Sequence, residues 1–247
     1  MSEDGSLSTE VATAFAKELA DKFPVEEALS PAAAQSGLIL SDIVKTLHLA
    51  LVPFQLLGAY QDRLRSFIDN SVRRVPEEKR IPPAPQILGP IIEGVRYEPE
   101  GTPIEAMFSE LLSRSIDQDR VQEAHPAYPL IVKQLSADEA RILARLNGRG
   151  FDYVYTKTLN AGTKLFSGEP AIEVDAFPRD GLSFPDNIIF YFNHLNQLGL
   201  AGIYQIGNQE ALFNGAIQTG TRVRSRYTLT DFGRRFVKAC IGAGAPL

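Results

Sequence analysis

The stretch "TRVRSRYTLTDFGRRFVKAC", residues 221–240, predicts a β-strand that runs directly into an α-helix. In its first part every second residue is an arginine, and alternate residues of a strand point to the same face of a sheet. Thr230 then supplies a hydroxyl that can cap a helix, while Asp231 and Lys238 suit the two ends of the helix dipole. The end of the chain is therefore expected to pack a strand and a helix together.

The residues before this stretch alternate between strands and helices. The segments 151–159 and 200–206 have the aromatic and β-branched composition that is typical of strands. A helix is expected from near Pro185 to Gly199, and residues 207–220 are expected to form a long hairpin loop. With a helix ahead of them, these elements follow an order close to that of a winged helix, in which a two-stranded wing follows the DNA-reading helix.

The helix in the position of the DNA reader, residues 187–198, contains neither lysine nor arginine. Its apolar residues are typical of a core, and the residues that could touch bases are Asn187, Asn193, His194, Asn196 and Gln197. Sequence-specific readers usually bring arginine or lysine into the groove. Direct base reading by this helix is therefore not favoured.

The first half of the chain predicts helices. Apolar residues at every fourth position form one stripe over 7–19, and further helical segments are expected over 35–52 and 57–75. We therefore expect a fold that is mainly α with a small β component, in which a helical N-terminal part precedes a winged-helix-like α+β C-terminal part. The predicted regions are an N-terminal helical region (1–80), a helical core (81–135) and the winged-helix-like region (136–247).

Two helix starts carry the clearest local signals. In "GTPIEAMFSELLSRSI" Thr102 can act as the cap, Pro103 occupies the first helical position and Glu105 can complete a capping box. In "LSADEARILARLNGRG" Ser136 and Glu139 have the same spacing. Both segments are therefore expected to begin helices at these residues.

Five arginines near the C-terminus are the candidate binding residues: Arg222, Arg224, Arg226, Arg234 and Arg235. The first three share one face of the predicted strand. Their pattern has three explanations: a solvated face that discourages edge pairing, docking onto the acidic N-terminal half or a second subunit, and binding of a phosphate backbone. Docking is favoured over nucleic acid, because a modest basic patch in an acidic protein is a weak sign of nucleic-acid binding.

Charge is unevenly distributed along the chain of 247 residues, whose net charge is −5. Residues 1–140 contain 13 Lys+Arg against 22 Asp+Glu, which gives −9. Residues 141–247 contain 12 against 8, which gives +4. The asymmetry indicates two halves with different surfaces.

No arrangement of residues in the sequence indicates catalysis or a bound metal. His48, His125 and His194 lack a carboxylate or a second histidine at the spacing of metal ligands. Cys240 is the single cysteine, so an internal disulfide is excluded, and its apolar neighbours are typical of a buried thiol. The sequence therefore predicts a protein that is not an enzyme and that holds no cofactor or metal.

The first residues of the chain and its longest uncharged run indicate where in the cell the protein is expected. The opening "MSEDGSLSTEV" is acidic and polar, which predicts no secretory leader and a cytoplasmic protein. The longest uncharged run, residues 46–61, contains His48 and Pro53 and is shorter than the roughly 18–20 apolar residues of a membrane-spanning helix. A core helix is the favoured interpretation, and docking on a membrane surface is the alternative.

The middle of the chain resembles a known family. The segment 81–143 combines Pro-Pro before an apolar helix, a helix ending in "RY", "MFSELLSRSID" and "HPAYPLIVKQLSADEARIL". With "LNQLGL" and "YTLTDFGRRFVKAC" further on, these motifs are similar to the abortive infection alpha (Abi-alpha) family over approximately residues 75–240. The resemblance implies a bacterial, α-helical, cytoplasmic protein linked to abortive infection, in which an infected cell halts before phage can spread. It implies no catalytic residues.

Together with the resemblance, these features predict a non-enzymatic phage-defence protein that acts through protein–protein interaction, with a protein partner or by self-association. One alternative is a winged-helix regulator that binds nucleic acid through the wing carrying Arg222, Arg224 and Arg226. A second alternative is an effector that acts on the membrane through residues 47–57. Nucleic acid and membrane are the less favoured partners.

Overall fold

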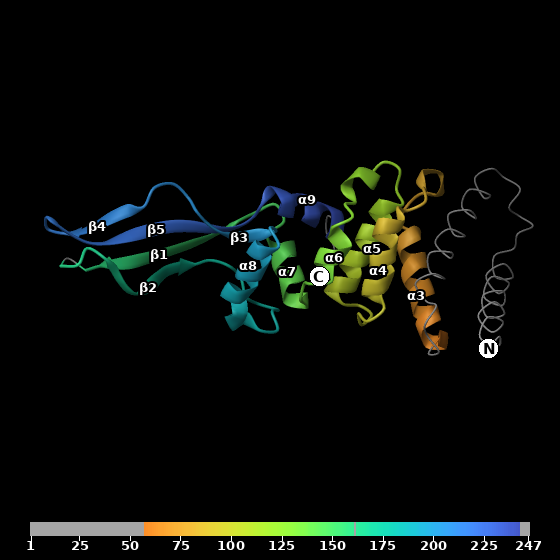
Figure 1. The fold of residues 1–247 in the computed structure, drawn as a ribbon, viewed down its shortest axis with the longest axis horizontal. Helices are drawn as coiled ribbons and strands as arrows, with labels where there is room; N and C mark the ends of the chain where they lie inside the picture. The colour runs from red at the N-terminus through yellow and green to blue at the C-terminus, as the bar shows by residue number, and fades with distance from the viewer. Residues whose placement is uncertain (1–56, 161, 243–247) are drawn as a thin grey trace, which may run out of the picture. The chain divides into compact units, whose positions relative to one another are not determined.

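The computed structural model describes residues 57–160 and 162–242 of the chain. The chain divides into two compact units, Met1–Gln134 and Leu135–Leu247 (Figure 1). The helices expected over 7–19 and 35–52 lie outside the described residues.

The described part of the first unit is helical. Its helices share a core in which Met107, Leu111 and Leu112 are fully buried. The predicted start of one helix is confirmed, because the Thr102 hydroxyl accepts a hydrogen bond from the Glu105 N–H at 3.1 Å. The predicted capping box is not formed, because the Glu105 carboxylate accepts from the Gly101 N–H instead of the Thr102 N–H. The helices are α3 (Leu57–Val72), α4 (Pro85–Val95), α5 (Pro103–Ser115) and α6 (Tyr128–Val132), with short 3₁₀ turns at Glu77–Lys79 and Val121–Glu123.

The described residues of the second unit form three α-helices, two of which begin at a side-chain cap. Ser136 and Glu139 form the predicted capping box: the Ser136 hydroxyl accepts from the Glu139 N–H at 3.2 Å, and the Glu139 carboxylate accepts from the Ser136 N–H at 2.8 Å. The Thr230 hydroxyl caps the last helix as predicted, accepting from the Gly233 N–H at 2.8 Å. The helices are α7 (Ala137–Arg145), α8 (Ile188–Gln197), which follows a 3₁₀ turn at Pro185–Asn187, and α9 (Asp231–Cys240).

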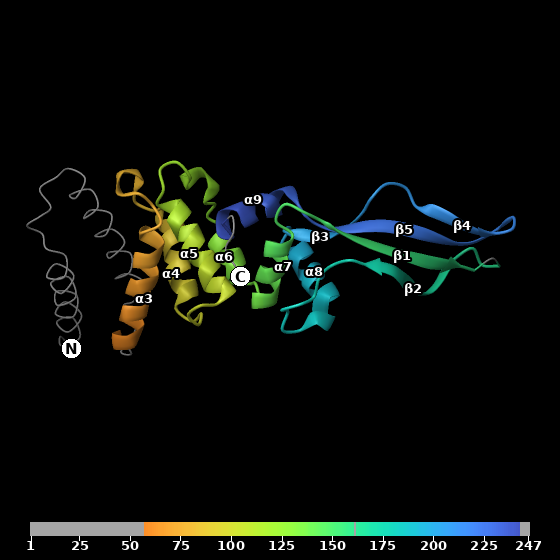
Figure 2. The same cartoon turned by 180° about the vertical axis from the view of Figure 1, so that it is seen from behind.

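The same unit holds a five-stranded antiparallel sheet with the order β2-β1-β5-β3, in which β4 also pairs with β5 (Figure 2). The long strand β5 is central, because β3 pairs with its last residues and β4 with its first residues along the same edge. The sheet therefore has an inner part beside the helices and an outer part made of β1, β2, β4 and the start of β5. The strands are β1 (Phe151–Leu159), β2 (Phe166–Asp175), β3 (Ala201–Gln205), β4 (Glu210–Asn214) and β5 (Ile217–Leu229).

The predicted fold class is wrong. The described residues form seven α-helices and a five-stranded sheet, so the protein is not mainly α and the C-terminal region is not a winged helix with a two-stranded wing. Residues 207–220, expected to be a loop, contain β4 and the beginning of β5. The glycine- and proline-containing segment after the first strand forms β2 and pairs with β1. The physical reason is that these outer strands are held by backbone pairing and by exposed ion pairs, and they bury too little to show an apolar pattern.

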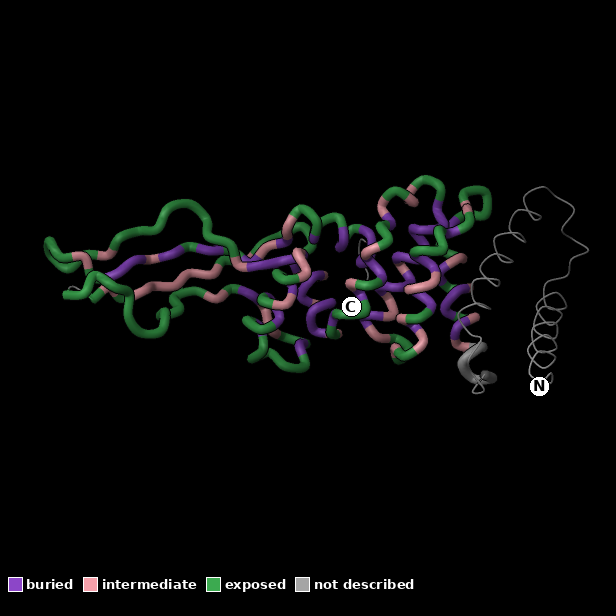
Figure 3. The backbone as a smooth tube through the Cα atoms, viewed as in Figure 1, coloured by how far each residue is buried: buried purple, intermediate pink, exposed green. Residues whose placement is uncertain are grey.

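The inner part of the sheet forms the core of the second unit. The Tyr227 side chain of β5 is fully buried, and its ring lies 4.6 Å from that of Phe192 on α8 and 5.4 Å from that of Phe177, centroid to centroid. Burial decreases sharply towards the outer part, where β2 and β4 are almost entirely exposed (Figure 3). Helices therefore cover the inner part of the sheet, and the outer part is the region in which to look for a function.

Candidate functional site

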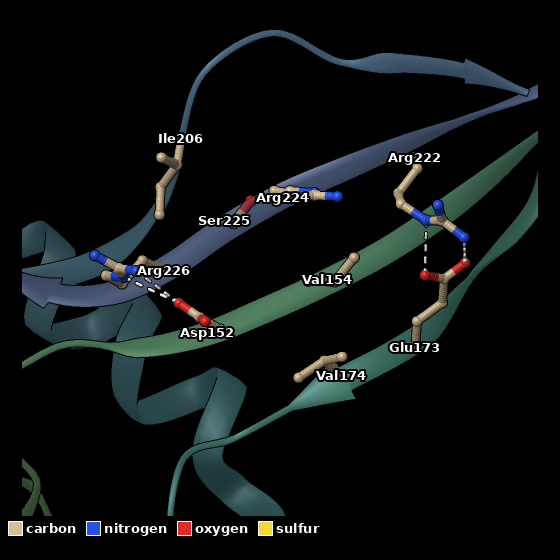
Figure 4. A pocket seen from close by; sticks show the side chains of 9 residues that line it. All are labelled: Asp152, Val154, Glu173, Val174, Ile206, Arg222, Arg224, Ser225 and Arg226. Carbon is tan, nitrogen blue, oxygen red and sulfur yellow. Dashed lines mark hydrogen bonds and ion pairs between the residues drawn. The ribbon is translucent and has the colours of Figure 1, made fainter.

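Three of the five predicted arginines lie together on β5. Arg222, Arg224 and Arg226 alternate along the strand and point to one face of the sheet, as predicted (Figure 4). Between them, Val223 and Ser225 are buried on the opposite face. We call the surface with the arginines the ionic face, because acidic residues of the sheet meet them there.

Arg222 is held by two carboxylates of neighbouring strands. Its Nε and Nη2 donate to Glu173 of β2 at 2.8 and 3.2 Å, and its Nη1 lies 3.4 Å from Glu210 of β4. The side-chain hydrogen bond with Glu173 raises the pKa of Arg222 above its ordinary value. Such two-pronged contacts between arginine and carboxylate fix the guanidinium in one orientation.

Arg226 is also paired within the sheet. It stands directly opposite Asp152 of β1 in the strand register, and its Nε and Nη2 donate to the Asp152 Oδ1 at 3.0 and 2.9 Å. Both side chains are about half exposed, so solvent screens the pair and its contribution to stability is small.

Arg224 lies between these two pairs without an ion pair in the described residues. An open hollow of about 400 Å³ surrounds it, lined by Val154 of β1, Val174 of β2 and Ile206 (Figure 4). An exposed guanidinium beside valine side chains can bind a carboxylate that carries an apolar neighbour.

The ionic face carries no net formal charge. Its three arginines are balanced by three carboxylates, Asp152, Glu173 and Glu210. Binding of a phosphate backbone depends on uncompensated positive charge, so this balance disfavours nucleic acid. The sequence could not show it, because the partners of Arg222 and Arg226 lie 49 and 74 residues away along the chain.

The other two predicted arginines are not part of this site. Arg234 lies on α9, donates to the Leu229 carbonyl at 2.9 Å and forms an ion pair with Asp231 one turn earlier. Arg235 lies beside it on α9, and neither arginine lines the hollow around Arg224. The five arginines therefore do not form one basic surface.

The opposite face of the outer sheet is apolar. Residues that stand directly opposite each other in an antiparallel sheet share a face. The register therefore places Tyr155 with Val223 and Ile172, and Leu159 with Phe166. On β4, Phe213 lies two residues from Ala211, which pairs with Thr221 on this same face. We call this surface the apolar face; its members are Tyr155, Leu159, Phe166, Ile172, Phe213 and Val223.

Large side chains of the apolar face are open to solvent. Phe213 is 63 % exposed, Ile172 58 % and Phe166 51 %. The register assigns two charged residues of the described outer sheet to this face. The Nζ of Lys157 lies over the Tyr155 ring, 5.6 Å from the centroid, and Asp175 at the inner end of β2 accepts a hydrogen bond from the Tyr227 hydroxyl. Exposed apolar residues that gather on one face mark sites of interaction more often than scattered ones do.

A buried polar cluster joins α7 to α8 and was not expected from the sequence. The Asp138 carboxylate accepts hydrogen bonds from the N–H groups of Ser183 and Phe184, both at 2.9 Å, and from the Tyr191 hydroxyl at 3.0 Å. Burial works against its ionisation, but these hydrogen bonds and Arg141 outweigh it and lower the pKa of Asp138 below its ordinary value. The carboxylate therefore anchors the segment that leads into α8.

His194, which was considered for base contacts, is part of this cluster. Its Nδ1 lies 2.6 Å from the Oε1 of Glu139, whose other carboxylate oxygen accepts from the Ser136 N–H and hydroxyl at 2.8 Å. The pair ties α8 to the start of α7, which is a structural role. Nowhere in the described part of the chain do three or more histidine, cysteine or acidic side chains gather as a metal site would need.

Comparison with known proteins identifies one family. A family model described as abortive infection alpha matches residues 56–240 of the chain. No curated protein and no solved structure matches the chain.

Proposed function

The chain belongs to the abortive infection alpha family, and we propose that it acts in phage defence as a non-enzymatic protein that binds protein through the outer part of its sheet. Abortive infection ends the growth of an infected cell before phage can spread. A protein can contribute to it by recognising another protein, without any chemistry of its own.

One observation carries the proposal: the outer sheet presents Phe166, Ile172 and Phe213 to solvent on one face. A sheet must normally bury one face against a second layer, because exposed apolar side chains cost free energy. Aromatic residues are the side chains that contribute most to binding between proteins. The apolar face thus has the composition of the centre of a protein interface.

The ionic face supports a binding function over catalysis. Asp152 and Glu173, the carboxylates that line the hollow, both accept hydrogen bonds from arginine. These carboxylates are therefore engaged in pairs within the sheet, as expected of groups that hold a surface together.

The alternatives have less support. Nucleic-acid binding by the arginines is disfavoured by the carboxylates that balance them. The apolar segment considered for membrane docking lies mostly outside the described residues, and no helix among the described residues has the length and apolar content to cross a membrane.

Phage challenge of cells that express the full chain tests the proposal. The double substitution Ile172→Glu and Phe213→Glu places charges on the apolar face and is expected to abolish protection. The matched control, Ala171→Glu with Thr158→Glu, adds the same charges at exposed positions of the opposite face and should protect like the wild type. Full protection by the first variant, or no protection by the wild-type chain, would overturn the proposal.

A further inference from the structure

We propose that the partner of the apolar face is the apolar face of a second copy of this chain, so that two outer sheets pack face to face in a symmetric dimer. This inference rests on the proposed function, since it names the protein that the outer sheet binds. It concerns Tyr155, Leu159, Phe166, Ile172, Phe213 and Val223.

The first argument is that the described residues supply a second layer to the inner part of the sheet and none to its outer part. In the inner part Phe192 of α8 and Phe177 cover Tyr227 of β5. Four residues earlier on the same face of β5, Val223 is flanked by its strand neighbours, but Ile172 and Phe213 at the margins remain exposed. Two-layer packing is the usual way to bury such a face, and a second sheet supplies it in sandwiches.

The second argument is charge. Two charged side chains lie on this face according to the register of the described outer sheet, and both are already engaged there: the Lys157 cation lies over the Tyr155 ring, and Asp175 pairs with Arg179 and accepts from the Tyr227 hydroxyl. A partner with a strongly charged surface would lose hydration there without gaining ion pairs. A surface that is itself apolar and nearly uncharged matches this face, and the second copy provides one.

The third argument is area. Residues 217–224 of β5 span about 27 Å, and four rows of strands are about 19 Å wide, which gives a face of about 500 Å² per copy. Two copies would bury about 1,000 Å², the lower limit of specific interfaces. The face is therefore large enough for a dimer of moderate affinity and too small for an extensive obligate assembly.

The helical layer limits how two copies can meet. Phe192 of α8 and Phe177 cover the inner part of this same face, so the inner parts of the two copies must lie at opposite ends of the dimer. A two-fold axis that crosses the strands satisfies this condition and places β2 of one copy over β2 of the other, with both contacts equivalent. Phe166 pairs with Leu159 near the tip of the sheet, and Ile172 pairs with Tyr155 nearer the helices. Phe166 therefore faces the partner's Ile172, and the same contact occurs twice.

Sedimentation equilibrium of the full chain, up to about 100 µM so that micromolar affinities register, tests the inference. The wild type should approach the mass of a dimer. The double substitution Ile172→Glu and Phe213→Glu should weaken association at least about 100-fold, since two large apolar contacts are replaced by buried charges. The control, Ala171→Glu with Thr158→Glu, should associate like the wild type. Far-ultraviolet circular dichroism confirms that each variant is folded.

Two results would overturn the inference. One is a monomeric wild type, which is expected if another segment of the chain or a different protein covers the apolar face. The other is a dimer that Ile172→Glu with Phe213→Glu leaves intact. Comparison with phage challenge separates the two proposals. If the wild type is monomeric and Ile172→Glu with Phe213→Glu abolishes protection, the dimer is contradicted and the proposed function is retained. A dimer that this variant breaks without loss of protection retains the dimer and contradicts the proposed function.

Discussion

The inner and outer parts of the sheet differ in how far their apolar side chains are buried, although β5 runs through both. In the inner part the side chain of Tyr227 is fully buried beneath Phe192 and Phe177. In the outer part the apolar side chains on the same face, Ile172 and Phe213, are more than half exposed. An apolar face becomes a core where a helix covers it, and a candidate binding surface where none of the described helices does. If this division is real, substitutions in the inner part of the sheet should destabilise the protein far more than substitutions in the outer part.

Phe192→Ala should have the largest effect on stability, because it removes the ring that covers Tyr227 and leaves a cavity. We expect the free energy of unfolding to fall by about 3–5 kcal/mol. Phe213→Ala, in dilute protein where copies are apart, should change it by less than about 0.5 kcal/mol. Urea denaturation measures both. Equal losses from the two substitutions would remove the distinction between inner and outer sheet.

Asp138→Asn tests how the helical cover is held in place. The amide would turn an N–H₂ group towards the N–H donors of Ser183 and Phe184, so we expect a loss of about 2–3 kcal/mol at neutral pH. The folded-state pKa of Asp138 is lowered, so its contribution is present above the unfolded-state pKa and is lost as pH falls through the folded-state pKa. The difference in unfolding free energy between wild type and variant should therefore shrink below about pH 4. A difference that is independent of pH would contradict this assignment.

Arg222→Ala examines the ionic face. The pair with Glu173 is partly exposed, so its loss should lower the temperature of unfolding only slightly, and less still at high salt. A double-mutant cycle with Glu173→Gln, followed by thermal unfolding, isolates the coupling. A coupling as large as the loss caused by Phe192→Ala would mean that the ionic face, and not the apolar one, stabilises the outer sheet.

Arg224→Ala should have the smallest effect. The side chain is exposed and has no ion pair in the described residues, so the free energy of unfolding should change by less than about 0.5 kcal/mol. Filter binding with duplex DNA at low salt provides the functional control, and neither wild type nor variant should bind. Salt-sensitive binding that Arg224→Ala reduces would revive the nucleic-acid alternative.

Local signals in the sequence predicted the helix starts correctly. Thr102, Ser136 and Thr230 each accept the expected hydrogen bond from the first turn of their helices. Capping depends on residues three positions apart, which a sequence displays directly. The strand β1 and the alternation of arginines on β5 were also predicted, because a strand pattern repeats every two residues and is likewise visible in the sequence.

The strands β2 and β4 were not predicted, because they bury almost no side-chain surface. β2 contains Gly168 and Pro170 and is exposed over nearly its whole length, so neither β propensity nor apolar alternation marks it. The expectation that the apolar residues of the helix over 187–198 belong to a core was only partly right. Ile188, Phe192 and Leu195 are buried, whereas Ile189 and Phe190 are exposed. Partners set by strand register, such as Glu173 for Arg222, cannot be read from one sequence.

Cross-linking tests the face-to-face dimer most directly. Facing sheets lie about 10 Å apart, so a short bismaleimide suits the interface better than a direct disulfide. Chains carrying Phe166→Cys are mixed with chains carrying Ile172→Cys, against a control mixture of Thr158→Cys and Ala171→Cys chains; the native Cys240 is buried. We predict rapid formation of mixed cross-linked dimers in the first mixture and little in the control. Equal cross-linking of both mixtures, or none in the first, would contradict the dimer.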